Sequence, residues 1–247
     1  AMSFEGRVAL VTGAARGIGA ASARAFAARG AAVVIADVLD EAEQTAADIV
    51  ADGGRAAFVR TDVADSASVR DAVDETVRLF GSLDFAHNNA GVFRAGPIAE
   101  LDDADWRTVI DVNLNGMFYA LKHELRHMLG HGGGAIVNTA SVWSFAGSAA
   151  QGAYVSAKHG VVGLTKSAVL DHGASGVRIN AVAPGPIDTP MTAAVPKDVM
   201  SATVARTVEN RFGRPEEIAA AVVWLCSDEA SYVNGSVLTV DGGWIAG

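Results

Sequence analysis

Short apolar runs alternate along this chain with longer segments of helical periodicity, and this alternation restricts the fold more than any other feature of the sequence. A strand that is followed by a helix and a second strand joins two parallel neighbours through a crossover. Several of the apolar runs are nearly continuous, which is typical of strands buried on both faces. We therefore predict an α/β fold with three layers, in which helices cover both faces of a doubly wound, mostly parallel sheet.

Seven strands and six main helices are expected. The strand segments are residues 7–11, 32–36, 56–60, 83–87, 135–139, 177–182 and 237–240. The helix segments begin near residues 17, 40, 66, 103, 152 and 216. The helix that begins at 66 has Val69, Val73 and Val77 along one stripe, and the others end near residues 29, 53, 128, 171 and 226. Asp40 with Glu43 resembles a capping box, Ser66 is expected to cap the third helix, and Pro215 suits the first turn of the last one.

Length and composition indicate one domain with no nucleic-acid or membrane partner. A chain of 247 residues is at the upper end for a single domain, expected here over residues 2–247 because Ala1 is interpreted as a remnant of an expression tag. The net charge of −9 opposes binding to phosphate backbones. No secretory signal and no apolar run of about 20 residues is present. Cys226, the only cysteine, is interpreted as a buried inert thiol, which fits a cytoplasmic protein.

A glycine-rich turn follows the first strand and opens the first helix, in the segment Thr12-Gly13-Ala14-Ala15-Arg16-Gly17-Ile18-Gly19. Such a turn lets the backbone approach a pyrophosphate, and the helix start offers free N–H groups and a positive dipole end to that anion. The spacing G-x-x-x-G-x-G differs from the commoner G-x-G-x-x-G, and a glycine turn alone can be purely structural. Its place after the first strand favours a dinucleotide site.

Asp37 follows the second strand, 20 residues after Gly17. A carboxylate at this place in a dinucleotide fold accepts hydrogen bonds from the adenosine ribose and repels a 2′-phosphate, so it favours NAD. Arg16 points the other way, because a guanidinium in the turn could attract a 2′-phosphate. We give Asp37 more weight, since its repulsion is unavoidable whereas an arginine can turn to solvent.

Tyr154 and Lys158 are four residues apart in a helical segment and therefore share one face. A free tyrosine has a pKa of about 10, too high for efficient acid–base catalysis near neutral pH, and a neighbouring ammonium is expected to lower it. The spacing is common by chance when it stands alone. Ser141 lies just beyond a strand, at the sheet edge where ligands bind, and its hydroxyl could hold a substrate oxygen.

Taken in chain order, these pieces resemble the short-chain dehydrogenase/reductase family over essentially the whole sequence. The matching residues are 12–19, Asp62-Val63, Asn88-Asn89-Ala90-Gly91, Asn113, Ser141, Tyr154-x-x-x-Lys158 and Pro184-Gly185. The resemblance implies a Rossmann fold, NAD as cofactor, transfer of a hydride to or from a carbonyl or secondary alcohol, and a homotetramer. Helices 103–128 and 152–171 and the segment 241–244 would then contact other subunits.

The resemblance also implies a role for each matching position. Tyr154 would exchange the substrate proton, Lys158 would lower its pKa and bind the nicotinamide ribose, Ser141 would hold the substrate oxygen, and Asn113 would anchor a water in a proton relay. The expected cofactor contacts are Gly13, Arg16, Gly17, Ile18, Gly19, Asp37, Asp62, Val63, Asn89, Ala90, Gly91, Tyr154, Lys158, Pro184, Gly185, Ile187 and Thr189.

The irregular, proline-rich stretch over residues 186–214 is interpreted as a substrate flap. Substrate contacts are expected from this flap and from Phe93, Arg94, Val142, Trp143, Phe145 and Gln151. Aromatic residues after Ser141 suggest a small apolar or alicyclic substrate, although they could equally pack under the flap.

No metal site is predicted. His123, His127 and His131 recur at helical spacing but lack an acid or cysteine to complete a ligand set, so they are interpreted as solvated helix surface. His87 is interpreted as the cap of a strand end. Two further functions stay open. The same motifs would suit an NADPH-dependent 3-oxoacyl-[acyl-carrier-protein] reductase, which Asp37 disfavours, or a nucleotide sensor, which would not need an acid–base group.

Overall fold

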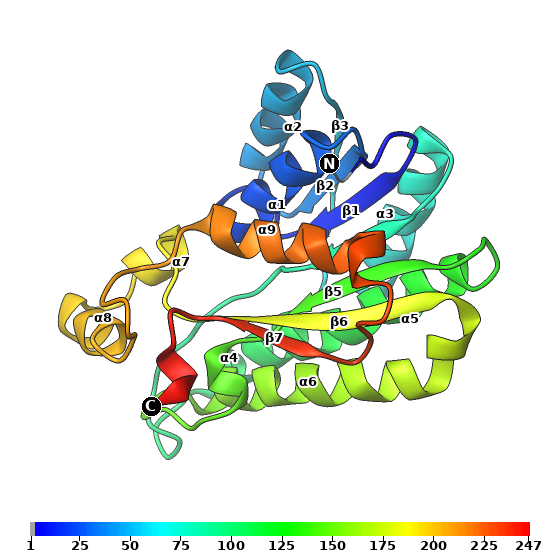
Figure 1. Cartoon of the computed structure of the whole chain (residues 1–247). Coiled ribbons are helices and arrows are strands. Elements are labelled where there is room, and N and C mark those ends of the chain that lie inside the picture. The colour runs from blue at the N-terminus through cyan, green and yellow to red at the C-terminus, as the bar shows by residue number, and fades with distance from the viewer. Residues whose placement is uncertain (1–2) are drawn as a thin grey trace.

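The computed structural model describes residues 3–247; Ala1, the expected tag remnant, and Met2, the expected first residue of the domain, lie outside the described residues. Seven strands form one sheet in the order β3-β2-β1-β4-β5-β6-β7 (Figure 1). Every neighbouring pair is parallel, so the sheet is more regular than the mostly parallel one predicted. The order reverses direction between β1 and β4, which is the doubly wound arrangement expected from the sequence.

The structure confirms the predicted elements with shifts of a few residues at their ends. The strands are β1 Val8–Thr12, β2 Ala32–Asp37, β3 Arg55–Arg60, β4 Phe85–Asn88, β5 Gly134–Thr139, β6 Val177–Pro184 and β7 Val237–Val240. The helices are α1 Gly17–Ala27, α2 Glu41–Ala51, α3 Ser66–Phe80, α4 Asp103–Ile110, α5 Gly116–Met128, α6 Gly152–His172, α7 Pro190–Ala193, α8 Lys197–Val204 and α9 Pro215–Cys226.

Two helical layers enclose the sheet. Helices α1, α2 and α9 pack over one face, around Phe26, Ile35 and Ile218. Helices α3, α5 and α6 cover the other face, around Leu10 and Ile136. Figure 1 shows α1 and α9 beside each other on one side of the sheet and α5 and α6 on the opposite side. Because both faces are covered, β1 is buried along its whole length, and its residues are apolar up to Thr12.

Two predicted helix caps are wrong. Asp40 makes no capping hydrogen bond to α2, and its carboxylate pairs with Arg60 on β3 instead. The cap of α3 is Asp65, whose side chain accepts a hydrogen bond of 2.9 Å from the backbone N–H of Ala67. Ser66 is the first residue of that helix, and its hydroxyl contacts His123. In both places a side chain that could cap the helix contacts a residue from another element instead, Arg60 for Asp40 and His123 for Ser66.

The long helix predicted over residues 103–128 contains one wide π-helical turn at Asp111–Asn115, between α4 and α5. Single π turns of this kind recur at functional sites, because the extra residue redirects a side chain. Here the turn carries Asn113, whose side chain is fully buried. Sequence periodicity did not predict the turn.

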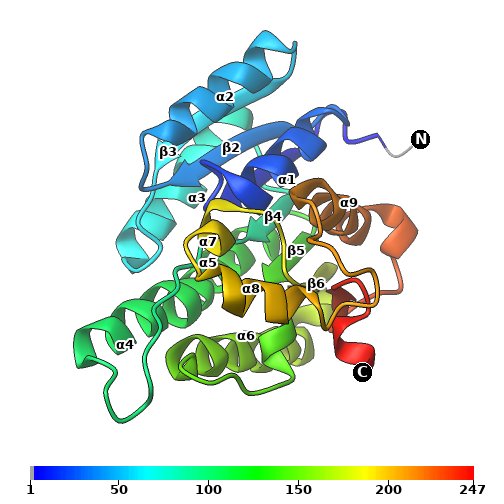
Figure 2. The same ribbon diagram turned by 90° about the vertical axis from the view of Figure 1, so that its left-hand side faces the viewer.

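Residues 186–214, predicted to form a flap, leave the sheet at the end of β6 and fold into the short helices α7 and α8 before returning to α9. Figure 2 shows α7 and α8 standing in front of the carboxyl ends of the strands. No helix within residues 3–247 is long and apolar enough to cross a bilayer. Cys226 is buried as predicted, and burial raises the pKa of its thiol to about 12.

Candidate active site

Four neighbouring strands bring the predicted site residues to one edge of the sheet. The glycine turn follows β1, Asn89 follows β4, Ser141 lies just beyond β5, and Gly185 follows β6. Because all strands are parallel, their carboxyl ends lie on the same edge, where ligands bind in doubly wound folds. Residues that lie far apart in the sequence therefore surround one place.

The glycine turn is tightly packed against the end of β4. Gly13 and Gly17 have positive φ angles of 63° and 59°, and a Cβ on Gly19 would lie 2.2 Å from the carbonyl oxygen of Gly13. The Asn89 side chain donates to the carbonyl oxygens of Thr12 and Gly13 at 3.2 and 3.1 Å. Only glycine fits this backbone, which then enters α1.

The first turn of α1 has chemistry suited to an anion. Arg16 precedes the helix in an extended conformation and makes no side-chain cap, and Gly17, Ile18 and Gly19 follow it. Backbone N–H groups at a helix start lack partners within the helix and attract phosphate. The turn and its donors therefore fit the pyrophosphate of a dinucleotide.

Asp37 ends β2 beside this turn. Its carboxylate accepts hydrogen bonds from the backbone N–H groups of Ala15 at 2.9 Å and Leu39 at 3.0 Å. Arg16, the residue that could attract a 2′-phosphate, points a half-exposed guanidinium toward Glu41, at 3.8 Å. Two carboxylates therefore lie near the positive charge of Arg16: Glu41 on α2 and Asp37 at the end of β2.

The remaining predicted cofactor contacts lie around the same edge. Asp62 and Val63 follow β3, where Asp62 accepts a hydrogen bond of 2.9 Å from the N–H of Ala64 and Val63 is buried against Gly116. Ala90 donates its N–H to the Thr12 hydroxyl at 3.1 Å, and Gly91 lies next to Asn113.

Ser141, Tyr154 and Lys158 come together at the end of β5. Tyr154 and Lys158 lie on α6, and the Lys158 ammonium is 5.6 Å from the centre of the Tyr154 ring. Ser141 and Tyr154 line the same cleft, and the Ser141 hydroxyl accepts the N–H of Trp143 at 3.2 Å. Lys158 donates to the carbonyl oxygen of Thr139 at 2.7 Å, so the end of the strand holds the amine.

The pKa values in this cluster differ from the sequence expectation. Lys158 was expected to lower the pKa of Tyr154, but burial raises that pKa to about 12, and the nearby Ser141 hydroxyl offsets only part of the rise. Burial also lowers the pKa of Lys158 to about 8. In the protein alone, desolvation therefore outweighs the attraction between an ammonium and a phenolate.

Asn113 fastens the loop that follows β4. Its side-chain oxygen accepts the N–H of Val92 at 2.8 Å, and its amide donates to the Val92 carbonyl at 2.9 Å. A side-chain amide has two N–H donors and two lone pairs on its oxygen, so each group keeps one further hydrogen bond. Asn113 can thus hold the loop and still bind a water.

The start of the flap lies over the glycine turn. Pro184 ends β6, and the N–H of Gly185 donates to Val240 at 3.1 Å. Ile187 is buried, and the methyl group of Thr189, which caps α7, lies 3.4 Å from where a Cβ of Gly17 would stand.

A cleft opens between the flap and the end of β5 and contains about 580 Å³ of empty space. Its walls are mainly apolar, with Ser141 and Tyr154 among the few polar groups. The predicted residues Phe93, Val142, Trp143 and Gln151 line it, together with Gly185, Pro186, Met191, Thr192, Val195, Val199, Met200 and Thr203. Arg94 and Phe145, also predicted, do not line the cleft: Arg94 forms an ion pair with Asp105 at 3.3 Å, and Phe145 is half exposed.

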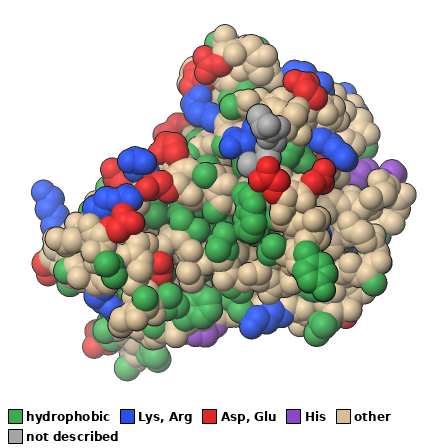
Figure 3. Space-filling model, in the orientation of Figure 1, with side chains coloured by type: hydrophobic (Ala, Val, Ile, Leu, Met, Phe, Trp, Pro, Cys, Tyr) green, Lys and Arg blue, Asp and Glu red, His purple; other side chains and the backbone are tan. Residues whose placement is uncertain are grey.

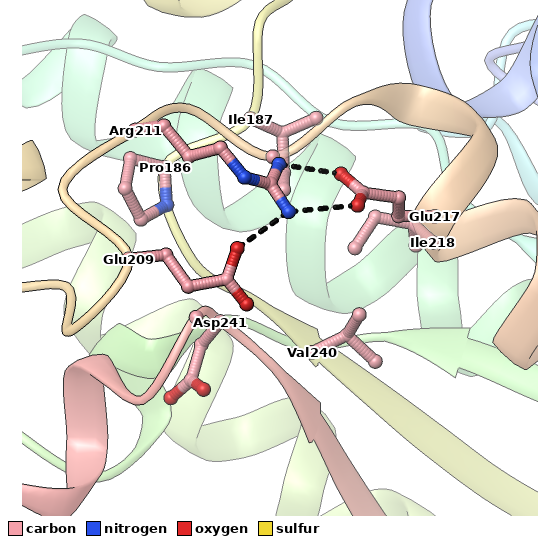
Figure 4. Close-up of a pocket in the computed structure, with 10 residues that line it drawn as sticks. Pro186, Ile187, Glu209, Arg211, Glu217, Ile218, Val240 and Asp241 are labelled. Carbon is pink, nitrogen blue, oxygen red and sulfur yellow. Dashed lines mark hydrogen bonds and ion pairs between the residues drawn. The ribbon is translucent and has the colours of Figure 1, made fainter.

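A second hollow of about 430 Å³ lies behind the base of the flap and contains none of the acid–base residues. There Ile187 and Gly213 form a short bridge that joins the two ends of the flap. Figure 4 shows Arg211 between Glu209 and Glu217, with both guanidinium nitrogens bonded to Glu217 at 2.9 Å. Arg211 holds the pKa of Glu217 at about 2. These contacts fix the base of the flap.

Two histidine interpretations are wrong. His87 does not cap a strand end but lies inside β4, fully buried, with its Nε2 2.9 Å from the Thr139 hydroxyl. Burial lowers its pKa to about 3. His123 is not solvated but buried, with its Nε2 3.0 Å from the Ser66 hydroxyl. His127 and His131 stack on each other, and no metal-binding cluster occurs within residues 3–247.

Glu124 on α5 was not singled out from the sequence, yet it is fully buried beneath the site. One carboxyl oxygen accepts a hydrogen bond of 2.9 Å from Asn88, and burial raises the pKa of Glu124 to about 7. The residue stands in a polar stretch of helix, so no sequence signal set it apart from a solvated glutamate.

Known proteins are similar to this chain in sequence and in fold. A family model described as enoyl-(acyl carrier protein) reductase matches residues 13–245. A cis-4-hydroxycyclohexanecarboxylate dehydrogenase of Sinomonas cyclohexanicum is 50% identical over 99% of this chain and 98% of its own. A cyclohexanol dehydrogenase of Acinetobacter sp. (strain SE19) is 44% identical over 98% of this chain and 96% of its own. Among solved structures, a protein assigned as a 2-deoxy-d-gluconate 3-dehydrogenase of Agrobacterium tumefaciens, with bound NADP, has a TM-score of 0.92 and 40% identity over 99% of this chain and 98% of its own.

Proposed function

Because the chain belongs to the short-chain dehydrogenase/reductase family, we propose that it is an NAD-dependent enzyme that moves a hydride between NAD(H) and a small alicyclic secondary alcohol or its ketone. Oxidoreduction of secondary alcohols is common to its closely similar relatives. The observation that carries the proposal is the meeting of Ser141 and Tyr154, with Lys158 behind them, in the wall of an apolar cleft.

The shape and chemistry of the cleft support a ring-shaped substrate. Apolar side chains of Phe93, Val142, Trp143 and Met191 surround the two hydroxyl groups of Ser141 and Tyr154. An apolar site with few convergent polar groups orients a substrate through those groups and accommodates its hydrocarbon part elsewhere. Two relatives are named for alcohols on a cyclohexane ring, which agrees with such a cleft.

Asp37 supports NAD over NADP. Its carboxylate lies at the end of β2 and is bonded to Ala15 of the glycine turn, where an adenosine ribose would meet it. A 2′-phosphate at that place would face this negative charge, and Arg16, its natural partner, is directed toward Glu41. A related structure contains NADP, so family membership does not support NAD over NADP. The proposed preference of this chain for NAD is therefore argued from Asp37 alone.

The residues of the site suit acid–base catalysis. When bound, the oxidised nicotinamide supplies the hydride acceptor and a positive charge. That positive charge would favour the phenolate and bring the Tyr154 pKa down from about 12, so that Tyr154 would accept the hydroxyl proton during oxidation and donate it during reduction. Ser141 would hold the substrate oxygen. Lys158 uses one of its three donors on Thr139 and keeps two for the cofactor ribose and a water. Asn113 retains one donor and one acceptor for that water, which would extend the proton path.

The alternative functions have weaker support. A reductase of acyl chains on a carrier protein would need NADPH, which Asp37 disfavours, and it would have to bind an acidic partner to a chain of net charge −9. A nucleotide sensor without turnover would not need a serine, a tyrosine and a lysine around a substrate-sized cleft. Both remain outcomes that the following test can report.

The test combines the purified protein with NAD or NADP and a panel of alcohols, and records reduced nicotinamide by its absorbance. We expect oxidation of cyclohexanol-type alcohols with NAD, slower oxidation of short acyclic alcohols, and little rate with NADP. Reduction of 3-oxoacyl thioesters with NADPH would overturn the proposal in favour of the acyl reductase. Tight NADH binding without turnover of any alcohol would favour the sensor.

We also propose a homotetramer located in the cytoplasm. Large apolar side chains are exposed along the helices expected at subunit contacts: Leu170 on α6 is 87% exposed, and Trp106 on α4 and Phe118 on α5 are nearly half exposed. Figure 3 shows hydrophobic side chains gathered across the middle of one face, between charged groups at its rim. Exposed apolar patches of this kind mark protein contacts. Light scattering at micromolar concentration tests the tetramer; a monomeric mass would contradict it.

A further inference from the structure

We propose that Trp244, near the C-terminus, is a positioning residue that sets the preference for ring-shaped substrates, because it joins one wall of the cleft to the returning arm of the flap. The substrate class in this inference rests on the proposed function. The contacts of Trp244 with Trp143 and Arg206 are independent of that function. The wall residue is Trp143, and the arm is the segment 206–209 that follows α8.

The first contact connects Trp244 to the cleft. Trp143 lines the cleft, and its ring meets that of Trp244 edge to face, with 4.8 Å between the ring centres and 76° between their planes. Edge-to-face pairs favour one relative orientation of the two rings. Trp244 is only 1% exposed, so it stands behind Trp143 as a buried support.

The second contact connects Trp244 to the flap. The guanidinium carbon of Arg206 lies 3.7 Å from the centre of the Trp244 ring, well within the range of a cation–π contact. No ion pair between Arg206 and an acid occurs in the described part of the chain, so the ring is its main partner. Arg206 lies two residues beyond the end of α8, whose Val199, Met200 and Thr203 line the cleft.

The backbone strengthens this connection. Val208 donates its N–H to the carbonyl oxygen of Gly242 at 2.8 Å, and a Cβ on Gly243 would lie 2.8 Å from a methyl carbon of Val208. Asp241 holds the turn in shape, because its carboxylate accepts the N–H groups of Gly243 and Ile245, both at 3.0 Å. These contacts hold the turn that carries Trp244 against the segment 206–209.

Figure 4 shows the other anchor of the flap, the ion pair of Arg211 with Glu217. That ion pair fixes the base of the flap to α9. The contact between Arg206 and Trp244 fixes the returning arm, residues 206–209, to the wall of the cleft. Loss of the base contact would leave the wall unchanged. Loss of Trp244 would release Trp143 and α8 together, and both would then shift away from a bound ring.

The experiment compares Trp244→Phe, Trp244→Ala and Arg206→Leu with the wild type. Trp244 Nε1 has no hydrogen-bond partner in the structure, so the phenylalanine variant removes no hydrogen bond and should retain ring preference. Arg55→Leu is a matched control, because Arg55 lies 5.4 Å over the Phe80 ring at the opposite edge of the sheet.

Two measurements distinguish the proposed role of Trp244 from a general loss of folded structure or activity. In Trp244→Ala and Arg206→Leu we expect the KM for cyclohexanol-type alcohols to rise about tenfold (~1.4 kcal/mol), the size of a lost aromatic or cation–π contact. The kcat/KM for 2-propanol and the Kd for NADH should stay within about twofold. Hydrogen exchange of residues 197–209 should accelerate in both variants and not in Arg55→Leu.

Each outcome is decisive. Equal losses for cyclohexanol and 2-propanol, or unchanged exchange in residues 197–209, would overturn the role of Trp244. If the wild type oxidises no alcohol, the proposed function fails, while the exchange measurement still tests whether Trp244 and Arg206 hold the flap. If Trp244→Ala does not fold, Arg206→Leu and Trp244→Phe carry the comparison alone.

Discussion

Asp37 Oδ2 accepts a hydrogen bond of 2.9 Å from the backbone N–H of Ala15, so the end of β2 is tied to the glycine turn that follows β1. The carboxylate therefore holds the turn, in addition to the role that we propose for its charge in the choice of cofactor. A simple truncation would remove both at once, and a variant that separates them is more informative.

Asp37→Asn can keep its one side-chain oxygen for the Ala15 N–H, but it loses the hydrogen bond from the Leu39 N–H and removes the negative charge. We expect the wild type to bind NADH at least tenfold more tightly than NADPH (~1.4 kcal/mol) and Asp37→Asn to lose most of that difference by gaining NADPH affinity. Fluorescence titration of both cofactors measures this. Arg16→Ala should lower the residual NADPH affinity of the variant. Tighter NADPH binding by the wild type would show that Arg16 outweighs Asp37.

Tyr154→Phe removes the phenolic hydroxyl and retains the ring, which packs edge-on against Phe93 with 5.6 Å between ring centres. We expect alcohol oxidation to fall by at least about 10²-fold, since the proton then has no acceptor. NADH affinity should stay within about twofold, because the fold of the cleft is unchanged. Initial rates and a fluorescence titration on the same preparation decide the matter; a fully active variant would exclude the acid–base role.

Glu124→Gln tests the buried carboxyl below the site. Its pKa is about 7 in the folded protein, raised by burial from an ordinary 4.5, so the folded state holds the proton more tightly than the unfolded state. The resulting stabilisation is complete below pH 4.5 and is lost as the pH rises through 7. The loss amounts to about 3 kcal/mol, from ~1.4 kcal/mol per pH unit.

Glutamine keeps the oxygen that accepts from Asn88 and cannot titrate. The free energy of unfolding of the variant, relative to the wild type, should therefore increase between about pH 4.5 and pH 7 and stay constant above. Urea unfolding at several pH values and one protein concentration measures this. Parallel pH profiles of the two proteins would show that the Glu124 pKa is not raised.

Gly19→Ala places a Cβ 2.2 Å from the carbonyl oxygen of Gly13, so the glycine turn must open. We expect NADH affinity to fall at least tenfold (~1.4 kcal/mol), with a loss of thermal stability. Gly130→Ala is the matched control, because its Cβ would meet only the His127 carbonyl oxygen at 3.7 Å. Wild-type affinity in Gly19→Ala would mean that this turn does not bind the cofactor.

The strands and main helices could be predicted because each depends on local sequence pattern. Within the run 7–11, residues 8–11 are apolar on both faces, which is typical of a strand buried on both sides, and Pro215 marked the start of α9. Because parallel strands have their carboxyl ends at one edge of the sheet, the position of Ser141 at that edge could be predicted from the strand order alone. The predicted parallel sheet and the family are confirmed.

Three of the wrong predictions share one cause. Asp40, Ser66 and His123 have side chains that could act locally, yet their partners lie far away in the sequence, and a local pattern carries no information on such partners. The burial of Glu124 likewise depends on the packing of α5 against β4, where Asn88 donates to its carboxylate.

The sequence by itself determined the order of strands and helices and the place of the glycine turn, because strand and helix periodicity and glycine conformation act over a few residues. Only the tertiary structure decided the pKa of Tyr154, the second role of Asp37 in holding the turn, and the support of Trp143 by Trp244. These properties depend on desolvation and on contacts between distant segments, which exist only when the chain is packed.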